Sequence, residues 1–95
     1  MKKKNHVTTG DIFDDLYSGE EAIEMKLRSD LMIKIRKAAE AKELTQHQLT
    51  KILDVPQSRV SDLLLGKIDK FSVSALIKLA SRLGLKVKLV VSKAA

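Results

Sequence analysis

The stretch that decides the fold is residues 45–63, which read TQHQLTKILDVPQSRVSDL. Its first residue and Gln48, three positions later, have the spacing of a capping box, the arrangement that starts a helix. Apolar residues then recur at i, i+3 and i+4, which predicts a short helix over about 46–53. The only proline, Pro56, stands where a first helical residue is allowed, and the next helix continues to Gly66. Two short helices joined by about three residues are therefore predicted.

Helix signals continue on both sides of this stretch. Ser18 and Glu21 repeat the capping-box spacing and begin the longest predicted helix, which extends to about Lys42. Ser72 has the character of an N-cap for a fourth helix, which Gly84 ends. The apolar face of the longest helix is expected at Leu27, Leu31, Ile35 and Ala38.

After Gly84 the hydrophobic period changes from 3.6 to 2, which predicts a half-buried β-strand over residues 85–91. Its apolar side consists of Leu85, Val87, Leu89 and Val91. No second strand of comparable quality occurs, so this one must pair with the N-terminal arm (residues 1–17), with a second subunit or with another protein. A second subunit is favoured, because antiparallel pairing across a two-fold axis needs only one sequence. The strand is thus the expected dimer contact.

The composition agrees with one small, mainly α-helical domain. The chain has 95 residues, with two Phe, one Tyr and no Trp, so its core must be aliphatic, which favours packed helices. The absence of cysteine excludes disulfides, thiolate catalysis and cysteine-bound zinc. His6 and His47 lack a neighbouring ligand at metal-binding spacing, and no serine has a histidine and an acid arranged around it. We expect no cofactor, no metal and no enzymatic activity.

The charge is distributed unevenly along the chain. The formal net charge is +6, and all of the excess lies in residues 51–95. Such a basic half makes a polyanion the first partner to consider. Residues 10–24 hold six acidic residues and no basic one. No apolar run is long enough to span a membrane and none follows the N-terminal lysines, so a soluble, cytoplasmic chain is expected.

The start of the second short helix carries the side chains that suggest a function. Gln57, Ser58 and Arg59 are its first outward positions. A helix fits the DNA major groove, where Gln pairs with adenine, Arg with guanine and Ser with either. The start of the preceding helix, at Thr45 and Gln46, offers N–H groups and an amide to a phosphate. The alternative is that these residues form an ordinary solvated polar face.

These motifs resemble the XRE, or lambda-repressor-like, helix-turn-helix family, whose pattern is Thr-Gln, three residues, a small residue, then Gly-Val-Ser and Val/Ile-Ser. A longer set of matches, over about residues 20–90, looks like the HigA-type antitoxin and small-regulator branch. That set is Leu31–Ile35, Leu44–Gln46, Gln57, Val60–Leu63, Gly66–Lys67, Phe71–Ser72 and Leu83–Val87. The resemblance implies a dimeric bacterial or phage repressor on an inverted-repeat operator, associated with the nucleoid. In the antitoxin members it also implies neutralisation of a small ribonuclease toxin.

The residue patterns and the resemblance together divide the chain into an arm at 1–17, a helix-turn-helix bundle of four to five helices at 18–84 with its reading unit at 45–66, and the strand at 85–91. Two sets of DNA contacts follow. Base-reading residues would be Gln57, Ser58, Arg59, Ser61 and Asp62. Phosphate contacts would be Thr45, Gln46, Lys67 and Lys70. Asp54 replaces the family's turn glycine and Pro56 its capping serine, so the turn is either strained or slightly different.

The acidic arm has two readings. Ribonuclease toxins are basic because they bind RNA, so the arm could contact one through the side chains of Ile12, Phe13, Leu16 and Tyr17. Alternatively, the acids only complement the dipole of the helix that follows. Two other functions also stay open: a stand-alone regulator without a toxin, and a protein-interaction module that no longer reads DNA. Asp54 and Asp62, acids close to the reading helix, favour the last of these.

Overall fold

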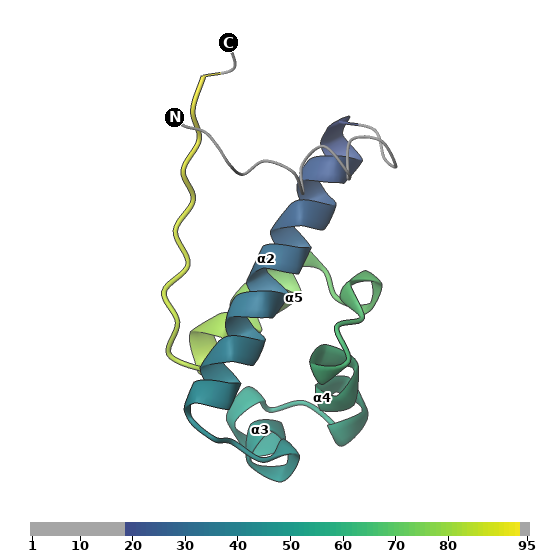
Figure 1. Cartoon of the computed structure of the whole chain (residues 1–95), viewed down its shortest axis with the longest axis vertical. Helices are drawn as coiled ribbons and strands as arrows, with labels where there is room; N and C mark the ends of the chain where they lie inside the picture. Colours follow the sequence, from purple (N-terminus) through teal and green to yellow (C-terminus); the bar gives the residue numbers. More distant parts are fainter. Residues whose placement is uncertain (1–18, 94–95) are drawn as a thin grey trace.

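The computed structural model describes residues 19–93, which form a mainly helical structure (Figure 1). The elements in chain order are α2 (Gly19–Ala41), α3 (Gln46–Leu53), α4 (Gln57–Leu64), the 3-10 turn η1 (Ile68–Lys70) and α5 (Val73–Arg82). Helix α2 is the long axis of the molecule, α5 packs against it, and α3 and α4 pack against each other near its C-terminal end. The four predicted helices are confirmed, whereas η1 was not predicted.

Local capping explains why the helices start where they do. At α3, the Gln48 amide N–H donates to the Thr45 hydroxyl (3.1 Å) and the Thr45 N–H donates to the Gln48 side-chain oxygen (2.8 Å), so the predicted capping box is formed. At α5, the Ser72 hydroxyl accepts the Ala75 N–H at 3.1 Å. Pro56 is extended and precedes α4 rather than being its first helical residue. The cap predicted at Ser18 lies outside the described residues.

Each α-helix is followed by a residue in the left-handed region of backbone space. Gly66 and Gly84 do this after α4 and α5, as glycine does readily. Glu43 (φ 54°) and Asp54 (φ 56°) do it after α2 and α3. Asp54 therefore keeps the geometry that a turn glycine would adopt, at a conformational cost of roughly 1–2 kcal/mol for a residue with a Cβ. Of the two outcomes open for this turn, the structure has the strained one.

One aliphatic core joins the helices. Its fully buried members are Met32, Ile35, Ala39, Leu49, Leu53, Val60, Leu63, Phe71, Leu76, Leu79, Ala80 and Leu83. On α2 the predicted face is confirmed in part: Ile35 is fully buried, Leu31 and Ala38 pack partly buried against the core, and Leu27 is 41% exposed. The first turns of α2 extend beyond the other described helices (Figure 1). An apolar period alone does not reveal where a helix leaves the core.

The β-strand predicted at residues 85–91 is not seen. The C-terminal tail (residues 85–93) is extended and has no strand partner among the described residues (Figure 1). An extended segment cannot satisfy its own hydrogen bonds, so alternation without a partner does not make a sheet. Only its root is fixed, where the Leu85 N–H donates to the Ala80 carbonyl at 2.9 Å and Lys42 Nζ donates to the Leu83 carbonyl at 2.8 Å.

Candidate nucleic-acid interface

Helices α3 and α4 form a two-helix unit with a buried inner side and a polar outer side. Leu49 and Leu53 of α3 and Val60 and Leu63 of α4 are all at most 1% exposed, so the two helices share a tightly packed core. The first turn of α4 then presents its polar residues to solvent. This is the arrangement in which a helix can lie in a groove while its partner supports it.

A hydrogen bond between side chains joins the starting points of α3 and α4. Gln57 Nε2 donates to Gln46 Oε1 at 3.2 Å, and both residues are exposed. Sequence reasoning placed both residues in the interface but did not foresee this bond, which depends on how the two helices cross. Because each residue lies in the first turn of its helix, the bond sets the side-chain amide of Gln57 beside the N-terminus of α3.

The N-terminus of α3 keeps donors for an anion. Thr45 is occupied as the cap, since its hydroxyl and its own N–H both bond Gln48. The N–H groups of Gln46 and His47, at the first positions of the helix, have no intrahelical acceptor by construction of an α-helix. They point along the helix axis, where its dipole favours a negative charge. Thr45 therefore serves this surface by shaping the helix start.

Arg59 lies apart from the other residues predicted to read bases. Its Nη1 donates to the Lys70 carbonyl at 3.0 Å, and its guanidinium carbon stands 4.1 Å from the centroid of the Phe71 ring. The side chain is half-buried, whereas Gln57 and Ser58 on the same turn are exposed. In this structure Arg59 connects α4 to the loop that precedes α5.

The remaining predicted contacts lie further along α4 and in the next loop. Ser61 and Asp62 are half-buried, and Lys67 and Lys70 are exposed. Asp62 Oδ1 is 3.7 Å from Lys67 Nζ, so the acid is partly neutralised by a lysine that was predicted to contact phosphate. Among the predicted base readers, Gln57 and Ser58 are thus the most accessible.

The other predicted contact residues divide between exposed and undescribed positions. Leu89 and Val91 are 79% and 81% exposed, Val87 is 41% exposed, and Leu85 is half-buried against the core. Leu85 therefore belongs to the domain, and the exposed apolar surface of the tail begins beyond it. The residues predicted for toxin contact, Ile12, Phe13, Leu16 and Tyr17, lie outside the described residues.

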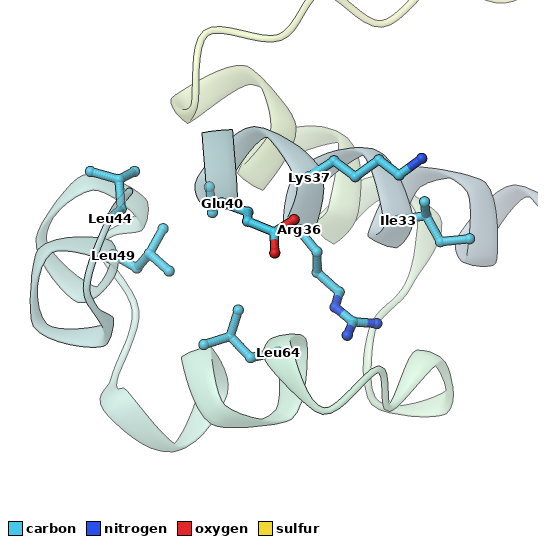
Figure 2. Close-up of a pocket in the computed structure, with 8 residues that line it drawn as sticks. Ile33, Arg36, Lys37, Glu40, Leu44, Leu49 and Leu64 are labelled. Atoms are coloured by element: carbon cyan, nitrogen blue, oxygen red, sulfur yellow. The ribbon is translucent and has the colours of Figure 1, made fainter. Parts of the chain in front are cut away.

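A hollow of about 500 Å³ lies where α2, α3 and α4 meet (Figure 2). Its lining is Ile33, Arg36, Lys37, Ala39, Glu40, Leu44, Leu49 and Leu64. The lining mixes leucines with two cations and one acid, and neither Gln57 nor Ser58 takes part in it. The hollow therefore does not belong to the polar surface at the start of α4.

Neither a metal-binding cluster nor a membrane-spanning helix occurs in the described part of the chain. Over residues 19–93, no three His or acidic side chains are grouped as a metal site would require. In the same range, no helix combines the length and the hydropathy needed to cross a membrane.

Comparison with known proteins agrees with this geometry. A search of curated proteins finds no match. A family model described as a helix-turn-helix domain matches residues 12–92, which include α2 to α5 and the Gln46–Gln57 bond. Helix-turn-helix domains place one helix in a DNA groove and support it with another, as the α3–α4 unit is built to do. The chain therefore belongs to this helix-turn-helix domain family, which indicates a DNA-binding regulator.

Proposed function

We propose that this protein is a sequence-specific transcriptional repressor that binds an inverted-repeat operator as a dimer. The observation that carries the proposal is the bond from Gln57 Nε2 to Gln46 Oε1. The bond joins Gln57, which is suited to contact a DNA base, to Gln46, which is suited to contact a DNA phosphate, and both side chains stay exposed. A structural role alone does not explain an exposed pair of amides that bridges the first turns of two helices.

The bond also determines what Gln57 offers to DNA. A glutamine amide has two N–H donors and one carbonyl acceptor. Because one N–H is used on Gln46, the second N–H and the carbonyl remain, and these are the two groups that pair with N7 and N6 of adenine. Gln46 thus orients the amide before DNA arrives. Ser58 lies beside it for a second base, with Ser61 and Asp62 one turn further along.

Phosphate contacts supply most of the affinity in this proposal. The N–H groups at the start of α3 bind one phosphate, and Lys67 and Lys70 in the loop after α4 bind others. Each neutralised phosphate adds roughly 0.9 to the slope of log affinity against log salt. Binding is therefore expected to weaken steeply as salt increases.

The dimer in this proposal forms through the C-terminal tail. Its outer part carries Leu89, Val90 and Val91, each at least 79% exposed, and its backbone lacks a strand partner in the described residues. A second tail, antiparallel to the first, would supply both the hydrogen bonds and the apolar cover. Two copies of α4 would then enter major grooves ~34 Å apart.

The finer assignment is to an antitoxin, and it rests on the sequence resemblance. In that role the acidic arm with Ile12, Phe13, Leu16 and Tyr17 contacts a small basic ribonuclease. A stand-alone repressor is the second candidate, and it needs only the surfaces described above. The gene next to this one discriminates between them, because an antitoxin requires a small basic protein encoded beside it.

Substitutions at Gln57 and Lys67 test the proposed repressor function. Gln57→Ala is expected to weaken operator binding by roughly 1–3 kcal/mol and to relax preference at one base pair. Lys67→Ala is expected to weaken all sequences alike and to lower the salt slope by about one unit. Binding to the DNA upstream of the gene and to random DNA, titrated at several salt concentrations, measures both. Equal losses on both DNAs for Gln57→Ala would remove it from the base-reading set.

The dimer has its own test. A chain that ends at Lys86 keeps Leu85 and its bond to Ala80, so the domain stays intact while the exposed tail is lost. Sedimentation is expected to give a monomer for this chain and a dimer for the full one. A dimer from the shortened chain would exclude the tail as the contact.

A further inference from the structure

We propose that Arg59 is a positioning residue, which holds the phosphate-binding loop at a fixed place relative to the base-reading turn of α4. The inference rests on the proposed DNA-binding function and deepens it. The sequence alone assigned Arg59 to a guanine. The geometry points instead to two contacts inside the protein, called the Arg59 bridge here: Arg59 to the Lys70 carbonyl and Arg59 to the Phe71 ring.

The two contacts of the Arg59 bridge use different parts of one guanidinium. Arg59 Nη1 donates to the Lys70 carbonyl oxygen at 3.0 Å, and the guanidinium carbon of Arg59 lies 4.1 Å from the Phe71 ring centroid. Both distances are within the range of favourable interactions. Phe71 is only 3% exposed, so its ring is fixed by the core. The bridge thus connects α4 to the core through the loop.

The loop is held at its start by backbone bonds and by Ile68, which packs against the core, and Arg59 adds a side-chain contact at its end. Its turn η1 has three residues and no side-chain cap at its start. Its backbone bonds begin with Lys67 N–H to the Asp62 carbonyl at 3.1 Å and Ile68 N–H to the Gly66 carbonyl at 2.9 Å. They continue with Lys70 N–H to the Lys67 carbonyl at 3.0 Å and Phe71 N–H to the Ile68 carbonyl at 3.3 Å. Arg59 binds the last carbonyl of this turn, which is the point where the chain re-enters the core.

The positions of Lys67 and Lys70 explain how the Arg59 bridge would affect DNA affinity. Lys67 and Lys70 lie on the two sides of the loop, and both are exposed. Asp62 of α4 holds the start of the loop at Lys67, and Arg59 holds its end at Lys70. If a flexible loop carried them, each DNA complex would have to order that loop, which lowers affinity without changing base preference. A loop already held by Arg59 avoids this loss. Base reading is then left to Gln57 and Ser58, which have no such commitment to the core.

Three variants separate positioning from base reading. Arg59→Met removes the charge and keeps the apolar stem, Arg59→Lys keeps the charge without the planar group, and Phe71→Leu removes the ring without touching the charge. Lys34→Met, on an exposed position of α2, is the control for loss of one positive charge. Each protein is titrated with the upstream DNA, with duplexes changed at each base pair, and with random DNA, at several salt concentrations.

A positioning role predicts a uniform loss. The strength of a cation–π contact gives an upper range of roughly three- to thirtyfold weaker binding to every duplex, for Arg59→Met and Phe71→Leu alike. The profile of base preference is expected to stay unchanged. Phe71→Leu should also lower the salt slope, although it removes no charge, because Lys70 is no longer held in place. Arg59→Lys should restore part of the affinity, and Lys34→Met should leave the preference and most of the affinity intact.

The opposite result would assign Arg59 to a base. Loss of preference at one base pair in Arg59→Met, together with an unchanged profile and salt slope in Phe71→Leu, overturns the proposal and leaves the repressor function standing. If the wild-type protein does not prefer its upstream DNA over random DNA, the repressor function fails, and with it the role of the bridge in binding.

A measurement on the free protein distinguishes failure of the Arg59 bridge from failure of the repressor function. Stacking on a ring shifts the side-chain proton resonances of Arg59 upfield, and Phe71→Leu is expected to abolish that shift. Amide hydrogen exchange at Lys70 and Phe71 is expected to become faster in Arg59→Met, while exchange in α2 and α5 stays the same. An unshifted Arg59 in the wild-type protein would show that the bridge is absent in solution and would overturn the proposal directly.

Discussion

The α3–α4 unit and the C-terminal tail are both short and both carry regular apolar patterns, yet only the first forms regular structure. Each helix of the unit bonds its own backbone, turn by turn, and α3 adds a capping box from the side chains of Thr45 and Gln48. The tail exposes Leu89, Val90 and Val91, and it has no ladder partner in the described residues. A helix satisfies its backbone hydrogen bonds within its own segment, so it forms in a single chain. A β-strand forms only when a second segment supplies the partners for its backbone.

The difference between the two regions is tested most strongly by replacing one leucine with alanine in each of them. Leu53 is fully buried, so Leu53→Ala is expected to reduce the free energy of unfolding by about 2–5 kcal/mol. Leu89 is 79% exposed, so Leu89→Ala is expected to change monomer stability by less than about 0.5 kcal/mol. Urea unfolding followed by circular dichroism, at concentrations where the protein is monomeric, measures both. Similar losses would mean that the tail is part of the folded core.

A second substitution tests whether the end of α4 is specified by backbone geometry. Gly66 has φ +76°, and a Cβ there would come within 3.2 Å of Arg36 Nη1. Gly66→Ala is therefore expected to cost roughly 1–2 kcal/mol of unfolding free energy. Gly19→Ala is the matched control, because a Cβ at Gly19 meets no atom within 4 Å. An equal effect at both glycines would remove the conformational explanation.

The cap of α3 is expected to have the next largest effect. Thr45→Ala removes the hydroxyl that accepts the Gln48 N–H, and the loss is expected to be about 1 kcal/mol. Thr45→Ser keeps the hydroxyl and should retain nearly all of the stability. Thermal unfolding compares the three proteins. If Thr45→Ser were as unstable as Thr45→Ala, the methyl group rather than the cap would matter.

The smallest expected effect is a gain. Asp54 occupies the left-handed region with φ 56°, so Asp54→Gly is expected to raise the free energy of unfolding by about 0.5–1 kcal/mol. The strain released is partly offset by the greater freedom of glycine in the unfolded chain. Asp54→Ala is the control, since it keeps the strain and removes the carboxylate. A gain from Asp54→Ala of the same size would point to charge rather than backbone strain.

The helix boundaries could be predicted because the signals that set them are local. The caps at Thr45 and Ser72 and the glycines at 66 and 84 act within a few residues of themselves. The buried face of α2 could be predicted only in part, because the helix has more apolar positions than the core covers. Leu27 matches the period as well as Ile35 does, and only the tertiary arrangement separates them.

The sequence indicated candidate residues for the site and did not indicate their contacts. Gln46 and Gln57 were placed in the interface by pattern, but their bond depends on the crossing of two helices. The Arg59 bridge depends on a loop whose turn η1 the sequence did not indicate. An arginine at an outward position of a reading helix looks the same in sequence whether it meets a base or a phenylalanine of its own core.

The anchored root of the tail limits how far a partner can stand from the domain. Leu85 is held by its bond to Ala80, and the six residue steps from there to Val91 span at most about 20 Å. A molecule held at Leu89–Val91 would therefore stay within about 20 Å of this root, close to the domain that carries α4. Such tethering gives effective concentrations on the order of millimolar for the second binding event. A short tail with a fixed root can thus couple two binding events without any change in the shape of the domain.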